Sequence, residues 1–226
     1  MNIVVIVKRI NAPSNASPSQ KVLDVGDKIA LDMAIGVREK CGVGNSHVSA
    51  LCIAPVEDSD VIRECYSLGA DVGYLLSDPL FEQLDLDGLI GVLSSSALKI
   101  DNCDVLVMVS ASNDAVTIDV GRRLAEMLKF KHASNVDAFD CQGNSRIVVK
   151  RANPKNGPER EVIELPVLIN LNCDSPLVVH NAMRIMKAFK KEVKIWTHKD
   201  LNVDSRKPQN PGIPTAVLHH KKRIQR

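Results

Sequence analysis

One segment, residues 104–128, constrains the fold of this chain more than any other, because it combines a buried strand, a polar loop and an amphipathic helix. Its apolar run, residues 105–109, is too short to cross a membrane and suits a central parallel strand covered on both faces. Ser112, Asn113 and Asp114 follow, and each is able to cap the helix. In open α/β sheets such loops bind phosphate-bearing ligands, since the helix N-terminus presents unpaired N–H groups there.

The same pattern also fits an ordinary strand–helix connection that binds no ligand. The loop carries neither a glycine-rich nor a lysine-bearing phosphate signature, so its residues on their own favour this simpler interpretation. A ligand site at this loop therefore needs support from the rest of the chain.

The composition indicates a globular α/β protein. The 226 residues suffice for one large domain or two small ones. Aromatic residues make up only 3% of the chain, so Val, Ile, Leu, Ala and Met must form the core, which suits parallel strands covered on both faces. The net charge of +2 is too small to indicate a nucleic-acid partner, and no segment is long enough to cross a bilayer.

The cysteines and the N-terminus bear on the compartment. The cysteines at positions 41, 52, 65, 103, 141 and 173 form no C-x-x-C pair and lack zinc-ligand spacing. Several lie in apolar patterns, which favours reduced core residues and a cytoplasmic location. The N-terminal apolar run fits a strand better than a signal peptide.

The order of elements predicts the fold class. Residues 1–128 predict alternating strands and helices: strands at 3–7, 47–53 and 72–76, helices at 27–41, 60–68 and 85–100 with Asp27 and Asp85 as caps, then the strand and helix described above. Residues 8–20 are expected to form a loop. This alternation predicts a parallel sheet with right-handed crossovers.

The rest of the chain predicts a small antiparallel addition. Short strands are expected at 136–139, 145–151 and 159–164, a buried strand at 167–171, a helix at 178–189 and a last strand at 193–197. We expect one domain over residues 1–202 and an extended basic arm over 203–226, which contains three prolines and no acidic residue after Asp204.

Motifs for catalysis are missing from the sequence. It has no nucleophile elbow, no Walker or Rossmann glycine pattern and no H-E-x-x-H or H-x-x-E-H zinc motif. No pair of carboxylates is marked as acid and base. A binding subunit without catalytic residues or a metal site is therefore the expected function class.

Several short motifs follow one another in a characteristic order. They are IVVIVKRI (3–10), DVGDKIAL (24–31), LGAD (68–71), the loop that ends in Val120-Gly121, LPVL (165–168), the loop 172–176, IMKAFKK (185–191) and VKIW (193–196). The set covers most of residues 1–202 and resembles the beta subunit of electron transfer flavoprotein. The Ser-Asn-Asp loop and the stretch 81–83 are similar to the branch tied to nitrogen fixation and carnitine metabolism.

The resemblance implies a fold, cofactors and partners. The implied fold is a three-layer α/β/α, adenine-nucleotide-binding (alpha-hydrolase-like) fold with a mostly parallel sheet. The implied partner is an alpha subunit that carries FAD, in a heterodimer that passes electrons between a dehydrogenase, acyl-CoA dehydrogenase-like or another flavin dehydrogenase, and a redox acceptor. The beta subunit of this family binds AMP in ordinary members and a second FAD in electron-bifurcating ones.

The resemblance also implies the positions that contact the nucleotide. These are Ile6, Asp24, Val25, Gly26, Asp27, Ile53, Val109, Ser110, Ala111, Ser112, Asn113, Asp114, Ala115, Val116, Thr117, Ile118, Asp119 and Val120. They lie at predicted carboxyl ends of parallel strands or at helix N-termini. This is the edge of the predicted sheet at which the strand, loop and helix of residues 104–128 already indicate a possible ligand site.

This chain departs from the family pattern at several of these positions. Val109 replaces a glycine, Val116 an aspartate, Asp119 a glutamine and Asp24 an asparagine, while Ala182 replaces a leucine of the recognition loop. The extra carboxylate of Asp119 is expected to weaken anion binding unless Lys8, Arg9 or the alpha subunit compensates for it.

Two other classes share the general fold. A stand-alone adenine-nucleotide-binding module of the universal-stress type predicts ATP binding by a homodimer, but its glycine-rich loop is missing here. An ATP-pyrophosphatase-like enzyme needs a Ser-Gly-Gly loop that is also missing.

Overall fold

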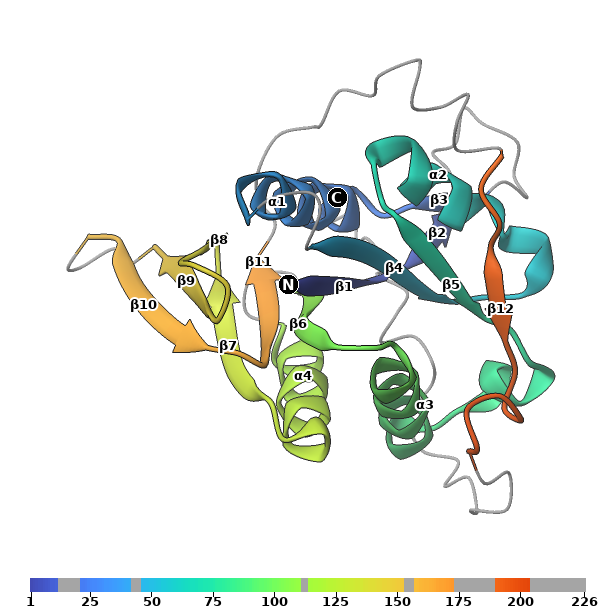
Figure 1. The fold of residues 1–226 in the computed structure, drawn as a ribbon. Helices are drawn as coiled ribbons and strands as arrows, with labels where there is room; N and C mark the ends of the chain where they lie inside the picture. The colour runs from blue at the N-terminus through green and yellow to red at the C-terminus, as the bar shows by residue number, and fades with distance from the viewer. Residues whose placement is uncertain (12–20, 42–45, 111–113, 153–156, 173–189, 204–226) are drawn as a thin grey trace, which may run out of the picture.

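The computed structural model describes residues 1–11, 21–41, 46–110, 114–152, 157–172 and 190–203. Its centre is a seven-stranded, fully parallel sheet in the order β12-β5-β4-β1-β6-β11-β7 (Figure 1). The strands are β1 (Asn2–Val7), β4 (His47–Ile53), β5 (Val72–Leu76), β6 (Cys103–Ser110), β7 (Lys131–Val136), β11 (Val167–Asn172) and β12 (Lys194–Trp196).

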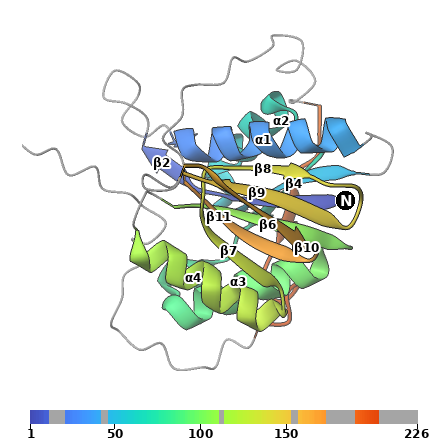
Figure 2. The same cartoon turned by 90° about the vertical axis from the view of Figure 1, so that its left-hand side faces the viewer.

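Helices cover both faces of this sheet. The helices α1 (Val25–Cys41) and α2 (Asp60–Leu68) lie on one face, and α3 (Leu86–Lys99) and α4 (Ala115–Leu128) on the other (Figure 2). Short 3₁₀ turns, η1 (Val56–Asp58) and η2 (Pro79–Gln83), precede α2 and α3. The predicted three-layer α/β/α fold is confirmed.

Each face has its own apolar core, which the alternation of side chains along the strands explains. In β1, Ile3 and Val5 pack in the core beside α1 and α2, whereas Val4 and Ile6 pack in the core beside α3 and α4. In β6, Val107 and Met108 divide between the two faces in the same way. Strands buried on both faces need continuous apolar runs, which is the pattern that the sequence shows.

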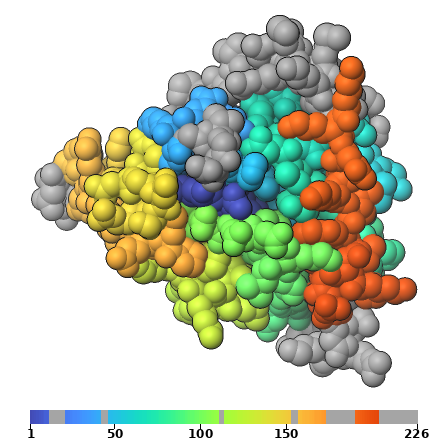
Figure 3. Space-filling view, viewed as in Figure 1, coloured from blue at the N-terminus to red at the C-terminus, as the bar shows by residue number. Residues whose placement is uncertain are grey.

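Two small antiparallel sheets add to this core. Strands β8 (Ala138–Cys141), β9 (Arg146–Arg151) and β10 (Glu159–Glu164) form a three-stranded sheet at one side, and β2 (Arg9–Asn11) pairs with β3 (Lys21–Leu23). In the space-filling view the three-stranded sheet projects from the side opposite β12 (Figure 3). The predicted antiparallel addition is therefore confirmed.

Several predicted elements need correction. The loop predicted at 8–20 contains β2, and the strand predicted at 136–139 is two strands that separate at Asp137. The parallel strand β7 was not predicted, because its sequence KHASNV lacks an apolar run. The predicted helix 178–189, residues 204–226 of the predicted arm, the loop 173–176 and Ala182 lie outside the described residues.

The start of α1 also differs from the prediction, since the helix begins at Val25 and Asp27 does not cap it. The Asp24 carboxylate accepts a hydrogen bond from the Gly26 N–H at 2.9 Å, and the Asp24 carbonyl accepts one from the Lys28 N–H at 3.1 Å. Asp24 thus fills the capping position. Asp85 caps α3 as predicted, accepting from the Gly88 N–H at 2.7 Å.

Within the described part of the chain, no helix is long and apolar enough to cross a membrane, and the described cysteines, all but Cys173, are free thiols.

Candidate nucleotide site at the carboxyl edge of the sheet

The sheet has a topological switch point between β1 and β6. The chain leaves β1 toward β4 on one side and, after β5, crosses to β6 on the other side. Because the connections diverge at the carboxyl ends of these two strands, a crevice opens there, and open α/β sheets bind ligands in such crevices. We refer to this side of the sheet as the carboxyl edge.

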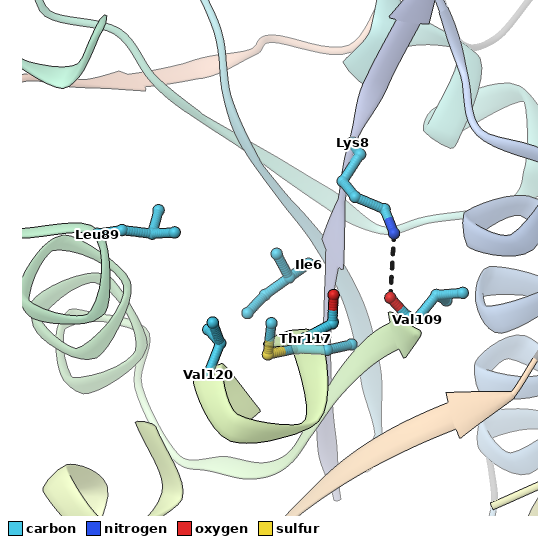
Figure 4. Close-up of a pocket in the computed structure, with 7 residues that line it drawn as sticks. Ile6, Lys8, Leu89, Val109, Thr117 and Val120 are labelled. Carbon is cyan, nitrogen blue, oxygen red and sulfur yellow. Dashed lines mark hydrogen bonds between the residues drawn. The ribbon is translucent and has the colours of Figure 1, made fainter. Parts of the chain in front are cut away.

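A small pocket lies at the switch point (Figure 4). Its volume is about 320 Å³, including the part that opens to solvent. The residues that line this rim pocket are Ile6, Lys8, Leu89, Met108, Val109, Thr117 and Val120. Its walls are therefore apolar except for one cation and one hydroxyl.

The Lys8 side chain supplies the cation. Its Nζ donates a hydrogen bond to the Val109 carbonyl at 3.0 Å, so that it reaches across from the end of β1 to the end of β6 (Figure 4). The side chain is only 9% exposed, and Nζ lies 3.9 Å from Asp27 Oδ1. An almost buried ammonium is thereby held at the mouth of the pocket.

Asp27 is the counter-charge of Lys8. Its Oδ2 accepts the Lys8 backbone N–H at 2.5 Å, while its Oδ1 has no hydrogen-bond partner. Burial raises the pKa of the Asp27 carboxyl to about 7, because desolvation penalises the charged form more than the attraction of Lys8 favours it. Asp27 therefore exists as a mixture of charged and neutral forms near neutral pH.

The N-terminus of α4 faces the same edge. Asp114 caps it, since its carboxylate accepts the backbone N–H groups of Val116 and Thr117 at 3.2 and 3.3 Å and the Thr117 hydroxyl at 2.7 Å. Of the three predicted capping candidates, Asp114 fills this role, while Ser112 and Asn113 lie outside the described residues.

Replacing Asp114 with alanine is expected to lower the free energy of unfolding by about 1 kcal/mol, because the first turn of α4 loses its cap. Asp114→Asn keeps a side-chain acceptor and is the matched control, with an expected change of a few tenths of a kcal/mol. Urea denaturation measures both values. Equal losses in the two variants would assign the effect to the carboxylate charge rather than to capping.

A buried polar contact fixes α4 against the sheet. Asn170, in the middle of β11, is fully buried; its Nδ2 donates to the Thr117 carbonyl at 3.2 Å, and its Oδ1 lies 2.6 Å from His132 Nε2. Gly121 faces this amide, and a Cβ atom there would lie 2.0 Å from Asn170 Oδ1. The glycine thus lets α4 approach β11 closely.

The predicted contact residues separate into groups. Ile6, Val109, Thr117 and Val120 line the rim pocket. Ile53, at the end of β4, packs against the core on the same face of the sheet. Ser110 is fully buried at the end of β6, and its Oγ has no hydrogen-bond partner. Ala111, Ser112 and Asn113 lie outside the described residues.

Apart from Thr117 and Val120, the predicted residues at the helix starts do not line the pocket. In the 24–27 segment, Asp27 contacts Lys8 through its carboxylate, and the Asp24 N–H donates to the Lys8 carbonyl at 3.2 Å, while Val25 is 45% exposed. Ala115, Val116, Ile118 and Asp119 lie on the first turns of α4, where Val116 is 50% exposed.

The Asp119 carboxylate forms an ion pair within α4. Its carboxylate pairs with Arg122 at 2.6 Å, and Arg122 also pairs with Glu126 at 2.5 Å. Arg9, one of the expected compensating cations, pairs instead with Asp58. Of the two cations expected to compensate, Lys8 is the one that reaches the rim pocket.

Four residues that build this site were not among the predicted nucleotide contacts: Lys8, which was expected only as a cation that compensates for Asp119, and Leu89, Met108 and Asn170. Lys8 stood in the quoted motif IVVIVKRI, so its position directly after a buried strand was a usable signal. Asn170 could be found as the one polar residue within the apolar run VLINL.

Comparisons with known proteins agree with this arrangement. The electron transfer flavoprotein domain matches residues 19–201. The electron transfer flavoprotein subunit beta of Thermoanaerobacterium thermosaccharolyticum is 29% identical over 96% of this chain and 86% of its own length. The caffeyl-CoA reductase-Etf complex subunit CarD of Acetobacterium woodii is 27% identical over 87% and 74%, and Protein FixA of Azorhizobium caulinodans is 27% identical over 96% and 83%. The chain therefore belongs to the electron transfer flavoprotein family.

Proposed function

We propose that this chain is the beta subunit of an electron transfer flavoprotein and that it binds an adenylate group, as AMP or as part of FAD, at the rim pocket. With an alpha subunit that carries FAD, it passes electrons between a flavin dehydrogenase, acyl-CoA dehydrogenase-like or of another type, and a redox acceptor. The flavin supplies the redox chemistry, and the role of this chain is to bind and orient the adenylate group.

The observation that carries this proposal is the position of Lys8, an almost buried ammonium at the switch point of a parallel sheet. The apolar walls formed by Ile6, Leu89 and Val120 suit an adenine ring, and the ammonium suits its phosphate. The N-terminus of α4 lies at the same edge, where Asp114 accepts two of its N–H groups. The residues present thus fit an adenylate group.

The direct test is to identify the bound nucleotide. The chain is co-expressed with its alpha subunit, the purified complex is denatured, and the released small molecules are identified by mass spectrometry. We expect a yellow complex that releases AMP in addition to FAD, or FAD in excess of the alpha subunit's own. A colourless complex without adenine nucleotide would contradict the proposal, and a homodimer that retains ATP would replace it with the universal-stress type of function.

A further inference from the structure

Lys8 has more hydrogen-bonding capacity than its surroundings use. An ammonium has three N–H donors, and the described residues offer Lys8 one acceptor, the Val109 carbonyl at 3.0 Å. Asp27 Oδ1, at 3.9 Å, is beyond hydrogen-bond distance. Desolvating an ammonium is costly, so a side chain that is 9% exposed and finds one acceptor among the described residues indicates a group that completes its contacts with a ligand.

Other unsatisfied groups lie along the same edge. Within the described part of the chain, the buried side-chain atoms without a hydrogen-bond partner are Asp27 Oδ1, Ser110 Oγ, Asn172 Oδ1 and Arg38 Nε. The first lies beside Lys8, and the next two end the neighbouring strands β6 and β11, where Ser110 and Asn172 are register partners. Since buried polar groups are normally paired, their concentration at the carboxyl edge points to a polar ligand there.

Other cations near this edge are occupied. Arg9 pairs with Asp58, and Arg122 pairs with Asp119 and Glu126. Of the seven residues that line the rim pocket, Lys8 is the one that carries a charge. The discrimination between a charged and an uncharged ligand therefore depends on this side chain more than on any other described residue.

We propose that Lys8 is the specificity-determining residue of the rim pocket, which selects a nucleoside monophosphate over the nucleoside by transferring its ammonium from the Val109 carbonyl to the ligand's phosphate. This inference rests on the proposed function, because it assumes an adenylate ligand. It adds the residue that distinguishes the phosphorylated ligand from the unphosphorylated one and the movement by which it does so.

The surroundings of Asp27 predict that this transfer takes up a proton. The charged and titratable groups that act on Asp27 are Lys8 from the end of β1, Asp24 before α1, Cys52 in β4 and Cys65 in α2. Lys8 is the one cation among them. Once its ammonium turns to a phosphate, Asp27 is left buried beside an added negative charge, which favours its neutral form. Binding of AMP therefore shifts Asp27 toward protonation near pH 7.

The test uses the full chain, co-purified with its alpha subunit and freed of nucleotide, and measures AMP and adenosine affinities by calorimetry. In Lys8→Gln we expect the preference for AMP over adenosine to fall by about ten- to a hundredfold, with adenosine affinity nearly unchanged. Lys8→Arg keeps the charge and is expected to retain most of the preference. Lys131→Gln, which removes an exposed lysine paired with Glu164, is the matched control and leaves the preference unchanged.

A second measurement does not depend on the folding of the Lys8 variants. Titrations of the wild-type complex with AMP at pH 7.5, in buffers of different ionisation enthalpy, give the number of protons taken up. We expect net uptake that decreases in Asp27→Asn, with the phosphate's own titration common to both proteins.

The outcomes separate the two proposals. If the wild-type complex binds neither AMP nor adenosine, the proposed function fails. If it binds AMP but Lys8→Gln loses AMP and adenosine affinity equally, or keeps the wild-type preference, the role of Lys8 is wrong while the proposed function stands. Equal proton uptake in wild type and Asp27→Asn would overturn the coupling to Asp27.

Discussion

Replacing Gly121 with alanine is expected to lower the free energy of unfolding by about 3 kcal/mol and to weaken the proposed adenylate binding. The new Cβ atom would lie 2.0 Å from Asn170 Oδ1 and 2.8 Å from Asn170 Cγ, far inside van der Waals contact. One of the two partners must therefore move.

Asn170 cannot yield without a further loss, because both ends of its amide are engaged. Nδ2 donates to the Thr117 carbonyl and Oδ1 contacts His132 Nε2, in a residue that is fully buried. Moving the amide away would leave polar groups unpaired in the core. The alternative is that α4 moves outward, and this displaces Thr117 and Val120, two walls of the rim pocket.

A matched control isolates the steric cause. Gly91 lies inside α3, and a Cβ atom there meets nothing within 4 Å. Gly91→Ala is therefore expected to be neutral or to stabilise the protein by up to about 1 kcal/mol, the usual gain in helix propensity. Urea denaturation compares the two variants. A Gly121→Ala protein as stable as Gly91→Ala would contradict the close approach of α4 to β11.

A second variant distinguishes packing from helix propensity. Asn170→Ser shortens the side chain that Gly121 faces, so the double variant Gly121→Ala/Asn170→Ser is expected to be more stable than the sum of the two single losses predicts. Additive losses in the double variant would show that the two residues do not compete for the same space.

The sequence predicted those elements whose signal is local. Apolar runs such as 105–109 and 167–171 marked buried parallel strands, and Asp85 with its apolar stripe marked α3, because capping and periodicity are properties of neighbouring residues. The strand β7 was missed, since its exposed edge carries polar residues and only its pairing with β11 makes it a strand. Pairing between distant segments leaves little trace in a local pattern.

In the candidate site, too, features with a local sequence signal were predicted, and features that depend on contacts between distant residues were not. The edge of the sheet followed from the strand order, but the roles of Asp24 and Asp27 did not. Both stand near the start of one helix and each is a reasonable cap. Asp27 is buried because the end of β1 lies against it and supplies the Lys8 N–H, a contact across 19 positions of the chain that periodicity does not contain. The contact of Asn170 with Gly121 is nonlocal in the same sense.

Replacing Asp27 with asparagine is expected to stabilise the protein at pH 8 by about 2–4 kcal/mol and to leave its stability near pH 4 almost unchanged. The Asp27 pKa rises from 3.8 to about 7 on folding, so the folded chain binds more protons than the unfolded chain between these values. Stability contributed by this group therefore falls as the pH rises from about 4 to about 7, and is constant above that. Asparagine does not titrate and still offers an oxygen to the Lys8 N–H.

The loss of the ion pair with Lys8 does not reverse this sign. The raised pKa already includes the attraction of the Lys8 ammonium, which is outweighed by the desolvation of a fully buried carboxylate. Denaturation of both proteins between pH 4 and 8 measures the difference, and Asp119→Asn, at an exposed carboxylate paired with Arg122, provides a control without burial. A difference that does not grow with pH, or an Asp27→Asn protein less stable throughout, would contradict the prediction.

Because the Asp27 carboxylate is expected to lower the stability of the fold at neutral pH, we infer that it has a functional role. The unsatisfied Oδ1 of Asp27 lies beside an ammonium that has one hydrogen-bond acceptor among the described residues, at the carboxyl edge where the sheet opens. An amide side chain, which still accepts the Lys8 N–H, would make a more stable protein at this position, but it would leave Lys8 without a counter-charge that can take up a proton. If Asp27→Asn gains stability and at the same time loses the proposed proton uptake on AMP binding, one group, the buried Asp27 carboxylate, accounts for both effects: it destabilises the fold and it takes up the proton.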